Sequence, residues 1–142
     1  MNNRGMVKGF RSLILARHGQ SLVEFALVLP LLVLIVAGIF DLGRAFFASI
    51  TITNAARVGA RYGTLHPRDF TGMVSAAVIE AQDSNIIITP ADVNIVCPID
   101  VDRCAPSQPI TVTVNYNYDD MLFAFFFPSG IQMQRQEIMV VP

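Results

Sequence analysis

Residues 19–40 read GQSLVEFALVLPLLVLIVAGIF, and this stretch decides the fold of the chain. Residues 25–40 carry no charge, but as a helix they reach only about 24 Å, less than the ~30 Å hydrocarbon core of a bilayer. A spanning helix must therefore also include Leu22 and Val23, which places Glu24 inside the membrane edge. The twelve Leu, Ile, Val and Phe residues of the uncharged run favour insertion by roughly 4–7 kcal/mol, against at most about 3 for one acid. The segment is predicted to insert despite its carboxylate.

A glycine lies five residues before Glu24, at the end of a basic N-terminal segment. Gly19, four intervening residues, the pair Glu24-Phe25 and an apolar helix resemble the processing site of type IV prepilins, where a membrane-bound prepilin peptidase cuts after the glycine. A wider match is similar to TadE-like pseudopilins of the tight-adherence (Tad, or Flp) pilus machinery. It comprises VEFALVLPLL at residues 23–32, Gly43-Arg44 and NAARVGAR at residues 54–61, and it covers roughly residues 17–63.

The resemblance implies how the chain is processed and what it does. Gly19 would end a basic leader of residues 1–19, Gln20 would begin the mature chain, and Glu24 and Phe25 would complete the processing site. The chain would be a minor pilin, or pseudopilin, a structural assembly subunit incorporated into a cell-adhesion pilus through its N-terminal helix. Its implied partners are prepilin peptidase, other pilins or pseudopilins, the inner-membrane pilus assembly platform and membrane lipid.

Charge is distributed unevenly along the chain. Ten basic and eleven acidic residues give a formal net charge of −1, but four basic residues precede Gly19 with no acid among them: Arg4, Lys8, Arg11 and Arg17. The positive-inside rule therefore predicts a cytoplasmic N-terminus and an extracytoplasmic C-terminal domain, anchored in the inner membrane. Residues 20–142 hold six basic and eleven acidic residues, which gives them no attraction for nucleic acid. A secretory signal peptide and an uncleaved anchor are the competing interpretations.

The helical pattern continues beyond the apolar run and predicts one helix over residues 20–63, spanning the membrane at about 22–40. Pro30 removes a backbone hydrogen bond and can kink this helix, either to set how it docks on its neighbours or without functional effect. Small residues near the end of the helix form a strip that lets another backbone approach closely, from the protein's own head or from a partner helix. The strip consists of Ala55, Ala56, Gly59, Ala60 and Gly63.

Residues 64–142 predict a small exported head, so that the chain as a whole is α+β. Asp69 or Thr71 can cap a short second helix that ends at about Asp83. One side of this helix is apolar and is expected to face the core, through Met73, Val74, Ala77, Val78 and Ala81.

Four segments of the head have the composition of strands. Residues 86–89 and 93–96 predict two short strands, and residues 110–118 alternate strictly, which predicts one buried and one wet face. Residues 131–141 alternate as well and are expected to pair with 110–118 in antiparallel fashion. Between them, residues 121–127 hold four phenylalanines, either buried or forming a contact surface.

Cys97 and Cys104 are the only cysteines of the chain. In an exported head they are expected to form a disulfide, because such pairs persist in oxidising compartments. Asp100 and Asp102 lie between them, but the glycine and the terminal glutamate of a calcium loop are missing, so no metal site is predicted. No motif for another cofactor occurs.

The sequence contains no recognisable catalytic constellation, and an enzyme is not predicted. Two classes of function remain: a structural pilus subunit, or a membrane-anchored extracytoplasmic ligand-binding module whose helix is a simple anchor. Gly19 and Glu24 separate them, because an anchor needs neither. In the first class, Glu24 would pair in low dielectric with the new α-amine of a neighbouring subunit's Gln20. Otherwise Glu24 snorkels to the cytoplasmic surface and serves only the peptidase.

Overall fold

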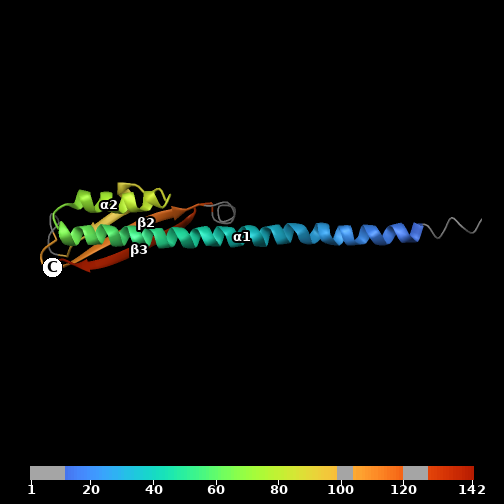
Figure 1. Ribbon diagram of the computed structural model, residues 1–142, viewed down its shortest axis with the longest axis horizontal. Coiled ribbons are helices and arrows are strands. Elements are labelled where there is room, and N and C mark those ends of the chain that lie inside the picture. The colour runs from blue at the N-terminus through green and yellow to red at the C-terminus, as the bar shows by residue number, and fades with distance from the viewer. Residues whose placement is uncertain (1–11, 99–103, 120–127) are drawn as a thin grey trace, which may run out of the picture. The chain divides into compact units, whose positions relative to one another are not determined.

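The computed structural model describes residues 12–98, 104–119 and 128–142, with side chains from Gly19 onward. Two helices and three strands make up these residues, together with a short 3-10 helix, η1 (Figure 1). In chain order they are α1 (Ser12–Leu65), α2 (Phe70–Asp83), η1 (Pro90–Asp92), β1 (Val93–Val96), β2 (Pro109–Tyr118) and β3 (Ile131–Val140). The α+β class predicted from the sequence is confirmed.

The chain divides into two compact units, Met1–Phe40 and Asp41–Pro142, and α1 contributes to both. In the first unit the described side chains are exposed from Gly19 through Val36. Among the described residues, the helix over Gly19–Leu65 is the one segment long and apolar enough to cross a membrane. The first unit therefore carries a candidate membrane anchor.

The start of α1 differs from the sequence prediction. We expected an irregular leader and a helix from residue 20, whereas α1 begins at Ser12. Leu and Ala between Ser12 and Gly19 are good helix formers, and a single helical glycine costs only about 1 kcal/mol, so the helix continues through Gly19.

The sheet is antiparallel throughout, in the order β1-β2-β3. Its central strand β2 pairs with β3 along its whole length, from Pro109↔Val140 to Tyr118↔Ile131, as the alternating patterns predicted. The prediction that one face of β2 is exposed to water is wrong at Thr113, which is buried. The cause is its central place, because Asn94 of β1 and Gln136 of β3 lie directly opposite on either side.

Residues 86–89 do not form the strand that their composition suggested. They precede η1, where the Asp92 carboxylate accepts hydrogen bonds from the backbone N–H and the hydroxyl of Thr89 at 2.8 and 2.7 Å. This capping interaction turns the chain at Pro90. Ile88 nevertheless is buried in the core, so its hydrophobicity reflects burial rather than strand pairing.

The second helix agrees with its prediction. Asp69 is the N-cap of α2, and its side chain accepts a hydrogen bond from the Gly72 backbone N–H. The predicted apolar stripe faces the core, with Met73, Ala77 and Ala81 buried and two flanking valines partly buried.

The core of the head lies where the second half of α1 meets α2 and the sheet (Figure 1). The largest fully buried side chains come from all three parts: Ile52, Met73, Ile110, Val112 and Val114. Residues 41–65 of α1 are therefore a structural part of the head.

Candidate functional site

The predicted processing segment lies on the exposed part of α1. A side chain at Gly19 would meet no other atom within 4 Å. One turn further, the Gln20 amide Nε2 donates a hydrogen bond to Glu24 Oε1 at 3.1 Å. These two residues meet because positions four apart share a helix face. Glu24 is thus held by the residue that the predicted cleavage would convert into the N-terminus.

Pro30 lies inside α1, and the helix continues on both sides of it. In an α-helix a proline leaves one carbonyl of the preceding turn without its N–H partner. It does not end the helix here, in agreement with its place in an apolar run.

The strip of small residues is covered by the protein's own head. All five of its members are buried. At Gly59, an added Cβ would lie 3.1 Å from the Met73 carbonyl oxygen and 3.2 Å from Ala77 Cβ, both on α2. At Gly63 it would lie 2.9 Å from the side chains of Met73 and Ile110. A partner helix therefore cannot occupy the strip while the head is folded.

Polar contacts join α1 to β3 at the edge of the sheet. Arg57 Nη2 lies 3.2 Å from Glu137 Oε1, with 57% of the arginine side chain exposed. Arg135 donates from Nη2 to the Ser49 hydroxyl at 2.7 Å. Exposed ion pairs contribute little to stability, typically about 0–1 kcal/mol. These contacts orient β3 along the helix more than they stabilise the head.

A buried hydrogen bond fixes the head where the uncharged run of α1 ends. The Tyr118 hydroxyl, at the end of β2, donates to the backbone carbonyl of Asp41 at 3.0 Å. Tyr118 is only 4% exposed and packs on Ala45 and Ala48. Sequence analysis missed this contact. The only signal was an aromatic residue on the inner face at the end of the strand.

A second polar cluster forms the corner between α1 and α2. Asp69 accepts from the Gly72 N–H at 2.8 Å and from the Tyr62 hydroxyl at 2.9 Å. The Gly72 N–H, followed by the Tyr62 hydroxyl, lowers the pKa of Asp69 because both bonds favour the charged carboxylate. Tyr62 also stacks on His66, with ring centroids 4.6 Å apart. His66 therefore belongs to this structural corner.

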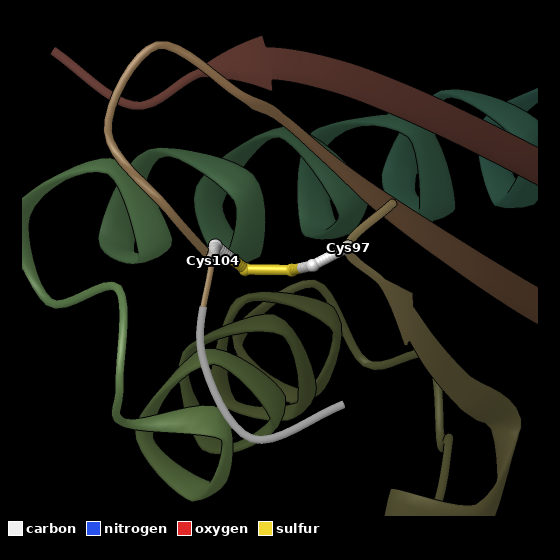
Figure 2. The surroundings of a disulfide bond; sticks show 2 residues. All are labelled: Cys97 and Cys104. Atoms are coloured by element: carbon white, nitrogen blue, oxygen red, sulfur yellow. A yellow bond between two sulfur atoms is a disulfide. The ribbon is translucent and has the colours of Figure 1, made fainter. Parts of the chain in front are cut away.

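The predicted disulfide is present between Cys97 and Cys104, with the two Cα atoms 5.3 Å apart. Figure 2 shows that it joins the end of β1 to the segment before β2. The backbone N–H of Cys104 donates to the Pro67 carbonyl at 3.0 Å, which attaches the bridge to the α1–α2 corner. Asp100 and Asp102, and the phenylalanines of 121–127, lie outside the described residues.

These observations define a class of protein: an α+β head built directly onto the second half of an N-terminal helix whose first half is apolar and exposed. This arrangement fits a single-pass membrane-anchored protein. The family model of TadE-like protein matches residues 19–61, so the resemblance seen in the sequence is confirmed for this segment. No curated protein and no solved structure matches the chain.

The match extends from Gly19 through the apolar run and into the part of α1 that forms the head core. The TadE-like family suggests a protein associated with the Tad pilus. It is a family of structural rather than catalytic components, and it implies interaction with other pilus components.

Proposed function

We propose that the chain is a minor pilin, or pseudopilin, of a tight-adherence pilus. Residues 1–19 are a leader that prepilin peptidase removes, and the helix of residues 20–63 spans the inner membrane at about 22–40. The head, residues 64–142 packed on the end of that helix, lies outside the cytoplasm. The supporting observation is the family match, which begins at Gly19, the residue after which cleavage is proposed.

Processing is tested with two glycine variants of α1 in the native host. Gly19 and Gly38 are both helical, and an added Cβ at either would meet no atom within 4 Å. Gly19→Ala should leave the full-length chain in the membrane, whereas Gly38→Ala should be shortened normally to a chain that begins at Gln20. N-terminal sequencing and intact mass distinguish the two products. A Gly19→Ala chain that is shortened like the control would contradict the proposal.

Glu24 is proposed to set the axial register between neighbouring subunits during assembly. In the chain described here its carboxylate accepts from the Gln20 side chain. After cleavage, the α-amine of Gln20 in a neighbouring subunit offers it a charged partner, and pairing in low dielectric recovers part of the cost of burying the charge. Assembly would then be favoured over the isolated subunit, in which the Glu24 carboxylate accepts only the neutral Gln20 amide within the membrane edge.

Two substitutions test this role apart from membrane insertion. Glu24→Leu and Glu24→Gln should both insert, and the leucine variant should insert better because it removes a charge from the membrane. Both should fail to co-purify with other pilus components. A leucine variant that is processed and still co-purifies at the wild-type level would leave Glu24 without a registering role.

The proposed orientation can be tested with protease. Protease added outside spheroplasts should digest the head and leave the membrane segment intact. Digestion only after the spheroplasts are lysed would instead place the head in the cytoplasm and contradict the proposed topology.

A further inference from the structure

A cavity of about 260 Å³ lies in the head beside the first turns of α1 that follow the uncharged run. Three parts of the chain line it: α1, the segment after α2 and the end of β2. The lining residues that matter here are Arg44 and Phe47 from α1, Asn85, Tyr116 and Tyr118 from the end of β2, and Asp119 directly after it. Sites for whole small molecules start at about 300 Å³, so the cavity suits a compact polar group rather than a large ligand.

The lining combines a cation, an anion and aromatic rings. Arg44 lies in α1 and Asp119 directly follows β2, and the two side chains carry opposite charges. A guanidinium binds phosphate through two parallel hydrogen bonds, and its five N–H donors allow this while Arg44 keeps its contacts within the chain. A carboxylate favours an ammonium group that carries N–H donors, through charge pairing and hydrogen bonds, and the neighbouring tyrosine rings add cation–π attraction to any ammonium. The cavity is therefore complementary to a small zwitterion that carries a phosphate and a primary amine.

The position of Arg44 identifies the source of such a group. Arg44 lies four residues after Phe40, where the uncharged run ends, or about 6 Å along the helix. The hydrogen bond from Tyr118 to the Asp41 carbonyl fixes the end of β2 at the same level. In an anchored chain this level is that of the lipid headgroups, where tyrosine is enriched.

We infer that this cavity binds the headgroup of an aminophospholipid such as phosphatidylethanolamine, with its phosphate on Arg44 and its ammonium on Asp119. The inference rests on the membrane anchoring in the proposed function but not on processing or on a role in the pilus. Binding would hold the head at a fixed depth on the outer surface of the membrane.

The test uses the full-length chain in nanodiscs that contain equal parts of phosphatidylethanolamine and phosphatidylcholine. The two lipids share the phosphate, but the quaternary ammonium of phosphatidylcholine cannot donate a hydrogen bond. Native mass spectrometry of the released chain counts each retained lipid. The wild type should retain phosphatidylethanolamine in preference, and Asp119→Asn should reduce the preference roughly tenfold, the size expected for a hydrogen bond to a charged group.

Arg44→Gln should lower retention of both lipids, because both carry the phosphate. Arg61→Gln is the matched control, an exposed arginine of α1 outside the cavity. It should retain lipid like the wild type. Far-UV circular dichroism should show an unchanged content of helix and strand in all three variants, since Arg44, Arg61 and Asp119 are exposed.

Equal retention of the two lipids by the wild type, or an equal loss in the Arg61→Gln control, would overturn the site and leave the anchoring intact. A chain that does not enter the bilayer would overturn both. Soluble glycerophosphoethanolamine should not displace the lipid at matched concentration. If it does, the ligand is a soluble phosphoamine and the lipid assignment is wrong.

Discussion

The packing of the head on α1 can be measured by replacing a glycine with alanine at two positions of this helix, Gly59 and Gly43, and comparing the stability of the two variants. Both are interior residues of the same helix, so replacing either with alanine gives the same gain in helix propensity, about 1 kcal/mol. Their surroundings differ. An added Cβ at Gly43 meets nothing within 4 Å, whereas at Gly59 it meets the Met73 carbonyl oxygen at 3.1 Å and Val112 Cγ1 at 3.4 Å.

The atoms around Gly59 cannot easily move away from an added methyl group. The Met73 oxygen is helix backbone, and Ala77, whose Cβ would be 3.2 Å away, has no side-chain torsion to relieve the overlap. Overpacking a core by one methyl group costs about 1–3 kcal/mol. Gly59→Ala should therefore lower the free energy of unfolding by about 0–2 kcal/mol, which is the overpacking cost less the gain in helix propensity. Gly43→Ala has no overpacking cost and should raise the free energy of unfolding by up to about 1 kcal/mol. The difference between the variants, about 1–3 kcal/mol, isolates the packing contribution.

The assay is thermal unfolding of the full-length chain in detergent, followed by tyrosine near-UV circular dichroism. The chain has no tryptophan, and its three tyrosines all lie within Asp41–Pro142, so the signal reports the head and not the apolar segment. A difference of 1 kcal/mol corresponds to about 4–8 °C in the Tm of a domain of this size. Gly59→Ala should melt at least about 4 °C below Gly43→Ala. Equal Tm values would show that α1 does not pack closely on α2, and would refute the reasoning.

Three further predictions concern the polar contacts and the bridge of the head. Cys97 and Cys104 should both resist thiol labelling without reductant, and reduction should lower the free energy of unfolding by about 2–3 kcal/mol; free thiols in freshly isolated protein would contradict the disulfide. Tyr118→Phe should lower the free energy of unfolding in urea by about 0.5–1.5 kcal/mol, because a buried hydrogen bond is lost; an unchanged value would mean that the bond does not form. Because the pKa of Asp69 is lowered in the folded chain, its ionised carboxylate stabilises the head at pH values above the unfolded-state pKa of about 4. This stabilisation is lost as the pH falls through the folded-state pKa. Asp69→Asn should therefore flatten the acid side of the plot of Tm against pH, and an unchanged slope would remove this role.

Much of the fold could be predicted because its signals are local. The apolar run, the Asp69 cap with its apolar stripe, and the alternation of β2 and β3 each specify an element within a few residues. The strand expected at residues 86–89 failed because an apolar run signals burial without saying whether the chain pairs, and a capping interaction at Pro90 decided the outcome.

The sites were less predictable because most of them join distant parts of the chain. The proposed processing segment could be located from the sequence alone, since Gly19 and Glu24 are close in it. The hydrogen bond from Tyr118 to Asp41 and the cavity beside Arg44 each need β2 to lie against α1, which no local pattern specifies. The sequence left open whether the small-residue strip packs on the head or on a partner, because small residues permit close packing but do not specify which element packs there.

The small residues of that strip also bear on how the chain enters the membrane during synthesis. Residues 41–65 emerge long before β2 and β3, at translation rates of about 5–20 residues per second, so for seconds the future core face of α1 has nothing to pack against. Each leucine or valine in a helix favours insertion by about 0.3–0.6 kcal/mol, and five of them in place of the strip would add roughly 1.5–3 kcal/mol. Such a face would draw the second half of the helix towards the bilayer after the first. Because the strip consists of alanine and glycine, the surface that later packs closely in the head can stay in water while the chain is being made. The apolar run alone then limits the length of the membrane segment, before the head has folded.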